Sequence, residues 1–581
     1  MCEDRSIESY GQLQALLNGE NIYKRLHHLY RLADEKYNSG LFHFQEEKGR
    51  AESPDKLTLS LKIDDKVLKE IIRRLYFPES PYEFSVLGAD ILGNVYEQCL
   101  GKVIRLTPGH RAIVEEKPEV KKAGGVYYTP NYIVDYIVKN TVGTLCEGKS
   151  PRQIEKLKIL DSACGSGSFL IGAYTSLLDY HRDWYVKDDP QKHTKEIYQG
   201  AGGHWYLTTQ EKKRILLNNI YGVDLDSQAV EVTKLSLLLK VLEGENQDSL
   251  TRQLKIWRER ALPDLGNNIK CGNSLIGPDF YQNQQMKLLD DEDRYRINVF
   301  DWHAEFPAVF PSPSGRGIKG EGEAAFDAVI GNPPYVRIQA LKEWAPIEVE
   351  YYKQAYKSAG KGTYDVYVVF VERGLSLLNK SGRLGFILPH KFFNAQYGEP
   401  LRGVLANGKH LAEVIHFGDQ QVFAGATTYT CLLFLDKAGS SQCRFVKVAD
   451  LTGWRGNGGA SEGFVPAARI TPSEWNFTVG KGAILLERLS KMPVKLEDVT
   501  DRIFQGIKTS ADKIYIVEEI ERRAKRVKVY SREKETEYWL EPDLLHPLIK
   551  GGDSKRYFLT YQPADSVPIR SRNRGRNGPH S

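Results

Sequence analysis

The stretch LKILDSACGSGSFLIGAYTSLLDYH, residues 157–181, decides the fold. It begins as a short apolar run that ends at Asp161, passes through a glycine-rich turn at 165–167, and continues as a helical stretch with apolar residues at helical spacing. A short apolar run that stops at turn residues is typical of a buried strand, and glycine permits the tight turn that follows. The stretch therefore predicts a strand, a loop and a helix in succession.

The same alternation recurs downstream. NNIYGVDLD (218–226), FDAVIGNPPY (326–335) and GRLGFILP (382–389) each combine a buried strand with a loop. Between them, SQAVEVTKLSLLLKVLEG (227–244) and YVVFVERGLSLLNKSG (367–382) have the spacing of helices. Strands that alternate with helices predict an α/β fold with a doubly wound, Rossmann-like, largely parallel sheet. Ligands of such sheets bind at the loops that leave the carboxyl ends of the strands.

The regions on either side differ in texture. Residues 1–122 are predicted to be mostly helical, as in VLKEIIRRLY (67–76). PSPSGRGIKGEGEAA (311–325) predicts a flexible insertion, and TGWRGNGGASEG (452–463) predicts a second flexible segment and a domain boundary. A block rich in Lys, Arg and Tyr begins near residue 491, and the final RSRNRGRNGPHS cannot form a core.

The composition excludes several classes of protein. Of 581 residues, 80 are Lys or Arg and 75 are Asp or Glu, so the net charge is only +5, and 41% are hydrophobic. These values are typical of a soluble globular protein with several domains, and they exclude a wholly disordered or collagen-like chain. No apolar run is long enough to span a membrane, and the N-terminus has no signal peptide. The cysteines are few and scattered and include no CxxC pair, which predicts a cytoplasmic protein without a metal site. The lack of a long apolar run predicts that the protein has no membrane partner.

Two of the predicted loops suit a nucleotide-like ligand. Gly165 and Gly167 let a ligand approach the backbone closely, and the following helix brings its N-terminal amides to the same place. A plain strand-to-helix turn is the alternative, because the loop lacks the spacing of NAD sites and of phosphate-binding P-loops. Asp224 ends the next strand and could accept hydrogen bonds from ribose hydroxyls, whereas Asp226 fits a helix N-cap better.

The motif NPPY (332–335) suits a planar base with an amino group. Pro333 and Pro334 fix the backbone and remove two amide donors. They leave a rigid pair of acceptors, the side-chain oxygen of Asn332 and the carbonyl of Pro333, and Tyr335 adds an aromatic face. A structural Pro-Pro turn would be credible if the two upstream loops were not present in the same predicted sheet.

In this order the motifs resemble those of the gamma-class S-adenosylmethionine-dependent DNA adenine-N6 methyltransferases. Within that class the chain is most similar to the large Type II G restriction–modification enzymes, over roughly residues 20–565. GGVYYTPNYIVDYIV (124–138) resembles the motif whose Thr, here Thr129, contacts the methionine carboxylate of the cofactor. CGNSL (271–275) resembles the motif that contacts the adenine of the cofactor. The family usually has Asp where this chain has Asn273. The cofactor-binding residues that the resemblance implies are Thr129, Asp161, Ala163, Cys164, Gly165, Asp224, Asn273 and Asn332.

The resemblance also implies the activity. The cofactor is S-adenosyl-L-methionine, and the partner is double-stranded DNA from which the target adenine is flipped. The implied catalytic residues are Asn332, Pro333, Pro334 and Tyr335. VFAGATTYTCLLFL (422–435) resembles the motif whose Phe, here Phe423, stacks on the flipped base opposite Tyr335. Cys164 is better explained as a small packing residue than as a nucleophile.

The resemblance gives the predicted regions their roles. They are a helical connector region (1–122), a methyltransferase domain (123–450), a linker region (451–490), a partial target-recognition domain (491–565) and a disordered basic tail (566–581). Within the recognition domain six basic residues could contact phosphates: Lys508, Lys513, Arg522, Arg523, Lys525 and Arg526. For the last four, the alternative is the solvated, charged face of a helix.

Two short patterns resemble a nuclease site only weakly. Pro54-Asp55 with Asp64-Asp65-Lys66, and Asp34 with Glu46-Glu47-Lys48, match the letters of a PD…(D/E)xK nuclease, but patterns this short arise by chance in a charged chain. The expectation is that the chain lacks the nuclease part and carries a truncated recognition domain, with a separate nuclease or specificity chain as a possible partner. Two alternatives stay open: a methyltransferase of the same fold that acts on RNA or on a protein glutamine, and an inactive DNA-binding remnant.

Overall fold

The computed structural model divides the chain into two compact units, residues 1–486 and 487–581, which are described separately. The residues that the structure describes are 2–37, 44, 55–80, 88, 91–93, 95–96, 102–106, 111–116, 129–200, 202–245, 262–282, 291–310, 326–423, 428–456, 458–479, 485, 488–489, 491–501, 516–548 and 565–568. The predicted insertion at 311–325 lies outside them, as does most of the predicted tail.

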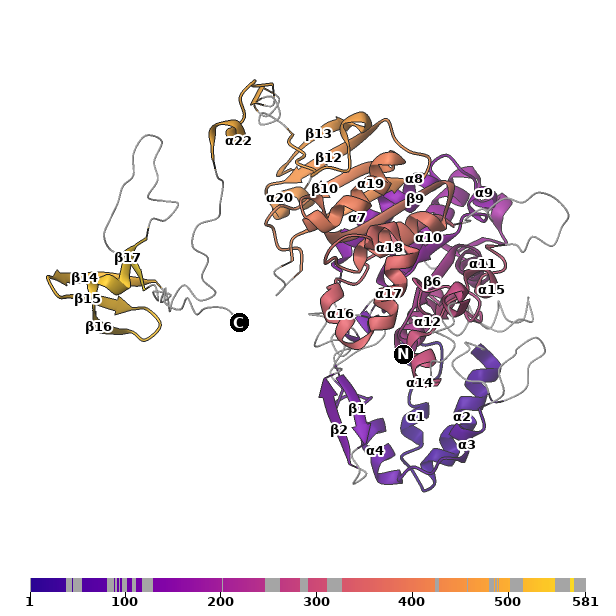
Figure 1. Cartoon of the computed structure of the whole chain (residues 1–581). Coiled ribbons are helices and arrows are strands. Elements are labelled where there is room, and N and C mark those ends of the chain that lie inside the picture. Colours follow the sequence, from indigo (N-terminus) through magenta and orange to yellow (C-terminus); the bar gives the residue numbers. More distant parts are fainter. Residues whose placement is uncertain are drawn as a thin grey trace. The chain divides into compact units, whose positions relative to one another are not determined.

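A nine-stranded sheet forms the centre of the first unit (Figure 1). Its order is β13-β12-β10-β11-β9-β8-β3-β6-β7. β7, β6, β3, β8 and β9 are parallel neighbours, β11 is antiparallel to both β9 and β10, and β12 is parallel to β10 and antiparallel to β13. The bounds are β3 (Ile159–Asp161), β6 (Ile220–Asp224), β7 (Ile269–Cys271), β8 (Phe326–Gly331), β9 (Leu378–Pro389), β10 (Leu411–His416), β11 (Thr430–Asp436), β12 (Gln442–Val448) and β13 (Ala460–Pro466).

Both faces of the sheet are buried, because successive side chains of a strand point to opposite faces. In β8, Ala328 and Ile330 join one hydrophobic cluster and Val329 joins the other. In β9, Phe386 and Ile387 divide in the same way. This explains why the strands appear in the sequence as continuous apolar runs, and it confirms the predicted doubly wound α/β fold.

Helices cover the two faces. The helices of the first unit from residue 131 onward are α7 (Asn131–Val138), α8 (Thr144–Cys146), α9 (Pro151–Ile154), α10 (Ser168–Asp188), α11 (Thr209–Asn219), α12 (Ser227–Val241), α14 (Asp291–Ile297), α15 (Trp302–Glu305), α16 (Ile338–Trp344), α17 (Pro346–Ala355), α18 (Tyr367–Leu377), α19 (Glu399–Asn407) and α20 (Leu451–Arg455). Buried residues of α7, α10 and α12 pack in one cluster, and those of α17, α18 and α19 pack in the other. The chain moves outward from β3 to β6 and β7, and then returns to β8 on the other side of β3. The strand order therefore reverses between β3 and β8, where ligands of open α/β sheets bind.

The N-terminal region contains a hairpin as well as helices. Its helices are α1 (Gln12–Ala15), α2 (Ile22–Tyr37), α3 (Leu57–Ser60) and α4 (Asp65–Arg73), and its strands are β1 (Lys102–Leu106) and β2 (Ala112–Glu116), paired antiparallel. The prediction of a mostly helical region did not include this hairpin. KVIRL and AIVEE are short and partly charged, so a local apolar pattern does not separate them from the helical stretches on either side.

The predicted linker at 451–490 contains ordered secondary structure. α20 lies within it, and β13 pairs with β12 as the edge strand of the large sheet. The structure places the division between units at Leu486 and Glu487 instead of within 452–463. β13 escaped prediction because an edge strand needs few apolar side chains, and five of its seven residues are exposed.

The second unit is a small sheet of order β16-β15-β14-β18-β17. Its elements are α22 (Leu496–Val499), β14 (Val517–Arg523), β15 (Arg526–Ser531), β16 (Thr536–Leu540), β17 (Leu545–Pro547) and β18 (Asp565–Pro568). The alternative of a charged helix face at 522–526 is wrong, because these residues end β14 and begin β15. Arg522 pairs with Glu519, and Arg523 pairs with Glu521 and lies over the Trp539 ring. Lys508 and Lys513 lie outside the described residues.

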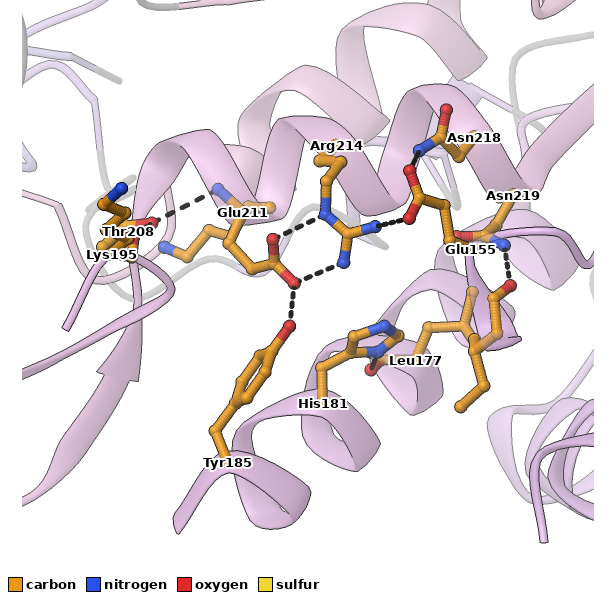
Figure 2. Close-up of polar contacts among 12 residues, drawn as sticks. Glu155, Leu177, His181, Tyr185, Lys195, Thr208, Glu211, Arg214, Asn218 and Asn219 are labelled. Carbon is orange, nitrogen blue, oxygen red and sulfur yellow. Dashed lines mark hydrogen bonds and ion pairs between the residues drawn. The ribbon is translucent and has the colours of Figure 1, made fainter. Parts of the chain in front are cut away.

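Figure 2 shows a chain of polar contacts that joins α9, α10 and α11. Glu211 on α11 is buried, and its carboxylate accepts hydrogen bonds from the Tyr185 hydroxyl at 2.7 Å and from Arg214 Nε at 2.7 Å. Arg214 also pairs with Glu155 at 3.2 Å. The Glu211 carboxylate raises the pKa of Arg214, and burial raises the pKa of Tyr185, so both groups stay protonated donors.

Replacing Glu211 with alanine is therefore expected to lower the free energy of unfolding by about 3 kcal/mol, since it leaves Arg214 and Tyr185 without their buried acceptor. Replacing Glu155, whose side chain is 44% exposed, should cost less than about 1 kcal/mol. Urea denaturation of the two variants beside the unaltered chain measures both values. Equal losses would contradict the assignment of Glu211 as the centre of the network.

No helix among the residues that the structure describes is long and apolar enough to cross a membrane.

Candidate active site

Four of the predicted site residues lie at one edge of the sheet. Asp161 and Asp224 end β3 and β6, Asn273 follows β7, and Asn332 follows β8. These four strands are parallel neighbours, so their carboxyl ends meet at the same edge. The fold therefore brings together residues that are up to 171 positions apart in the sequence, from Asp161 to Asn332.

The carboxylate of Asp224 is held by two backbone amides. Gly165 donates from the loop after β3 to Oδ2 at 2.8 Å, and Asp226 donates from the turn after β6 to Oδ1 at 2.9 Å. Burial raises the pKa of Asp224, and these amide bonds oppose the shift. A carboxylate oxygen can accept more than one hydrogen bond, so both oxygens of Asp224 can still accept from hydroxyl groups. As predicted, Asp226 is the N-cap of α12 and accepts from the amide of Gln228.

The loop between β3 and α10 has the conformation that its glycines predict. Gly165 and Gly167 have φ values of 53° and 87°, in the left-handed region that glycine adopts without strain. A Cβ atom at Gly167 would lie 2.8 Å from Thr233 Cγ2 of α12, so a larger residue cannot occupy that position without a shift. Thr233 donates from its hydroxyl to the Gly165 carbonyl at 2.8 Å and fixes the loop further.

Asp161 is almost fully buried and faces the end of β8. Its Oδ1 accepts from the amide of Ala163 at 3.1 Å. A Cβ atom at Gly331 would lie 2.6 Å from the same oxygen. Gly331 is thus required for the close approach of Asp161 to the start of NPPY. It was not among the predicted site residues, although the glycine directly before Asn332 was a visible signal.

The other loop residues have structural partners. Cys164 is buried, and burial raises the pKa of its thiol well above the usual range, which agrees with a packing role. Asn273 accepts through Oδ1 from the amide of Leu275 at 3.1 Å. Ser274, which the sequence reasoning missed, donates to the carbonyl of Ser162 at 2.7 Å and ties the loop after β7 to the loop after β3.

Asn332 has a buried acceptor that no described residue contacts. Its Nδ2 donates to the hydroxyl of Thr129 at 3.1 Å, whereas its Oδ1 is buried and has no hydrogen-bond partner among the residues that the structure describes. A buried acceptor without a partner costs free energy, so this oxygen is suited to accept from a ligand. Thr129 fixes the orientation of the amide, so the free oxygen has one defined direction. Thr129 and Asn332, both predicted site residues, are thus in direct contact across 203 positions.

The two predicted stacking residues are neighbours, but they do not yet form a slot. The ring centroids of Tyr335 and Phe423 are 6.4 Å apart, and the planes meet at 67°. A base stacked between two parallel rings needs about 7 Å, two van der Waals contacts. The Tyr335 hydroxyl donates to the Ile387 carbonyl of β9 at 3.1 Å, which holds that ring. Phe423 is 3% exposed, so its ring is packed among its neighbours.

The acidic residues of one nuclease-like pattern have structural roles. Asp64 is the N-cap of α4 and accepts from Lys66, and Asp65 accepts from the amides of Asn21 and Ile22 at 2.8 and 2.9 Å. Asp55 accepts from the amide of Thr58 at 2.9 Å. These residues belong to helices and turns instead of the paired strands that such a site needs. In the second pattern, Glu46, Glu47 and Lys48 lie outside the described residues.

A pair of histidines lies at the same sheet edge. His390 follows β9 and His416 ends β10, and their ring centroids are 4.1 Å apart. Burial, helped by His390 and Lys447, lowers the pKa of His416 to about 4. Its Nδ1 accepts from the amide of Gly418 at 3.0 Å, which requires an unprotonated nitrogen.

We expect His416 to make the fold sensitive to acid. Between pH 6.5 and about 4 the unfolded chain binds a proton that the folded chain does not, so stability is lost as the pH falls through this window. The contribution is at most about 3 kcal/mol. His416→Asn should therefore show a smaller fall in melting temperature between pH 7 and pH 4.5 than the unaltered chain. Equal falls would show that His416 does not titrate in this way.

Comparisons with known proteins show which families the chain resembles. Residues 218–423 match the family model described as Eco57I restriction-modification methylase, and residues 87–298 match N-6 DNA Methylase. The Type II restriction enzyme and methyltransferase RM.Eco57I of Escherichia coli is 34% identical over 573 residues, which cover 97% of this chain and 52% of that protein.

Two further proteins are more distant. The putative type II restriction enzyme and methyltransferase RM.MjaORFECS2P of Methanocaldococcus jannaschii is 25% identical over 66% of this chain and 41% of its own length. The solved structure of the type IIG restriction endonuclease BpuSI is 14% identical, with a TM-score of 0.38, over 97% of this chain and 54% of that chain, a likeness that carries no information on individual residues. The chain spans about half or less of the length of these curated relatives. The predicted resemblance is confirmed: residues 87–423 of this chain match N-6 adenine DNA methylase families, and nearly the whole chain is similar to part of a restriction–modification enzyme.

Proposed function

We propose that the chain transfers a methyl group from S-adenosyl-L-methionine to the exocyclic amino group of adenine in DNA, as the modification activity of a restriction–modification system. The observation that carries this proposal is the buried side-chain oxygen of Asn332, which has no partner among the described residues and is oriented by the bond to Thr129. An amino group is a donor that suits such an oxygen. The match to the methylase families supplies adenine in DNA as the acceptor.

The cofactor site is proposed to lie between the loop after β3 and the turn after β6. The Asp224 carboxylate would accept from ribose hydroxyls, and the backbone at Gly165 would lie against the cofactor. Asp161 would face its amino-acid end and Asn273 its adenine, and Thr129, Ala163 and Cys164 would line the same site. When bound, S-adenosyl-L-methionine supplies an electrophilic methyl group on a sulfonium.

The chemistry assigned to the protein is positioning. Asn332 Oδ1 and the Pro333 carbonyl would accept both hydrogens of the adenine amino group, so the nitrogen lone pair points at the methyl group. The nitrogen held by these two acceptors would then bond to the methyl carbon as the carbon–sulfur bond breaks, and the cofactor would leave as a thioether. The nitrogen then loses one proton to solvent, and no strong general base is needed.

The target base must leave the duplex to reach this site, because a base inside the stack cannot be approached by a buried group. Tyr335 is held by β9 and would form one side of the pocket, and Phe423 would turn to form the other. Pro333 and Pro334 keep the acceptor at Asn332 fixed relative to Tyr335.

A nuclease or specificity function in the same system is proposed for another chain or segment. The relatives named restriction enzyme and methyltransferase are about twice as long as the matched part. Part of the second unit, β14 to β18, is proposed as the start of a target-recognition domain. Arg526 and Lys525, at the turn of its first hairpin, would contact phosphates.

A substrate competition tests the proposal. The full chain is incubated with S-adenosyl-L-methionine that carries a labelled methyl group and with a mixture of duplex DNA, RNA and total protein. Label in DNA alone is the expected result. Label in RNA or protein alone would favour the other methyltransferases of this fold, and binding of the cofactor without transfer would favour an inactive remnant.

A further inference from the structure

A short helical segment of the N-terminal region contacts the proposed cofactor loops. Residues 91–93 and 95–96 are helical. A Cβ atom at Gly93 would lie 2.9 Å from Ser166 Oγ and 3.0 Å from Ser166 Cβ, so the backbone of this segment packs directly on the loop after β3. The Tyr96 hydroxyl donates to Asp226 Oδ2, in the turn after β6, at 3.4 Å. One helical turn therefore contacts both loops.

These two contacts flank the bonds that orient Asp224. Ser166 directly follows Gly165, whose amide donates to Asp224 Oδ2. The amide of Asp226 donates to Asp224 Oδ1. The segment thus fixes both of the turns whose amides hold the Asp224 carboxylate.

Tyr96 is suited to hold Asp226. Burial, together with the nearby carboxylates of Asp226 and Asp224, raises the pKa of Tyr96, so its hydroxyl stays a donor. The other oxygen of Asp226 caps α12 through the amide of Gln228 at 2.9 Å. The carboxylate is therefore held from two sides, and its backbone amide is held with it.

We propose that Tyr96 and Gly93 are positioning residues for the cofactor site: they clamp the two turns that aim Asp224 at the ribose of the cofactor. This inference rests on the proposed binding of S-adenosyl-L-methionine and assigns part of that site to the N-terminal region, outside the α/β sheet.

The first test removes only the hydroxyl. In the full-length chain, Tyr96→Phe is expected to raise the dissociation constant for S-adenosylhomocysteine about three- to tenfold by titration calorimetry, the loss of one long hydrogen bond to a charged group. Tyr180→Phe is the matched control, because Tyr180 donates to the Lys149 carbonyl at 2.9 Å near the far end of α10. It should leave the dissociation constant unchanged.

The second readout separates positioning from a general structural effect. The unaltered chain should bind S-adenosylhomocysteine more tightly than its 2′-deoxyribose analogue, because Asp224 contacts the ribose hydroxyls. In Tyr96→Phe this preference should shrink. A variant that had merely lost stability would weaken both ligands equally.

The third test uses Gly93→Ala. Alanine favours a helix over glycine, so the substitution is neutral or stabilising unless the contact with Ser166 matters. We expect weaker binding of S-adenosylhomocysteine, because the added methyl group would displace Ser166 and the loop after β3.

The outcomes separate this inference from the proposed function. No binding of S-adenosylhomocysteine by the unaltered chain would overturn the proposed function, and the inference with it. Normal binding by the unaltered chain with the same affinity and the same ribose preference in Tyr96→Phe would overturn the inference alone.

Discussion

Replacing Asn332 with alanine is expected to slow methyl transfer by about 10²- to 10³-fold, the usual cost of one group that stabilises a transition state in a buried site. The buried Oδ1 of this residue has no partner within the described part of the chain, so its contribution is expected to fall on the substrate amino group. Binding of S-adenosylhomocysteine should change by less than about threefold, because Asp224 and the loop at Gly165 stay intact. Single-turnover transfer to DNA measures the rate, and calorimetry measures the binding.

Asn332→Asp is the matched variant. The aspartate keeps an oxygen acceptor in the place of Asn332 Oδ1. The Thr129 hydroxyl, which accepts from Asn332 Nδ2 in the unaltered chain, can instead donate to the second carboxylate oxygen. We expect it to retain more activity than alanine by at least about tenfold. Equal losses in the two variants would contradict the role of this oxygen as an acceptor.

Replacing Asp224 with alanine is expected to weaken binding of S-adenosylhomocysteine by about 10²-fold or more. The carboxylate accepts from the amides of Gly165 and Asp226, and each hydrogen bond to a charged group is worth about 1.5–3 kcal/mol. Its loss releases the loop after β3 and also removes the acceptor for the ribose. The rate at saturating cofactor should fall less than the affinity, because Asn332 is untouched.

Asp450→Ala is the control for this prediction. Asp450 also accepts from two backbone amides, of Thr452 and Gly453, but it caps α20 outside the cofactor loops. A loss of affinity as large as that of Asp224→Ala would show that the effect reports general loosening of the fold. Normal binding by Asp224→Ala would remove Asp224 from the site.

Local apolar patterns predict the parts of this protein in which a buried strand is followed directly by a loop. Asp161, Asp224 and Asn332 could be placed at strand ends because each follows a buried apolar run. The same reasoning failed for the hairpin at 102–116 and for β13, where charged or exposed strands lack that pattern. It also left a charged helix open at 522–526, where Arg522 and Arg523 form ion pairs with glutamates of their own strand.

Contacts between distant segments could not be predicted from one sequence. The hydrogen bond from Asn332 to Thr129, the approach of Gly331 to Asp161 and the contact of Tyr96 with Asp226 each join separate elements. They depend on the order of strands in the sheet, which local apolar spacing does not determine. The edge-on arrangement of Tyr335 and Phe423 is of the same kind, because it depends on how the loop after β10 packs beside β8 and β9.

The identity of the methylated nucleoside tests the central claim most directly. Duplex DNA is incubated with the full chain and S-adenosyl-L-methionine, digested to nucleosides and separated by mass spectrometry, with Asn332→Ala in parallel. N6-methyl-2′-deoxyadenosine is expected as the sole new nucleoside, absent from the parallel reaction. Methylation of cytosine, or N6-methyl-2′-deoxyadenosine that forms equally with Asn332→Ala, would contradict the central claim.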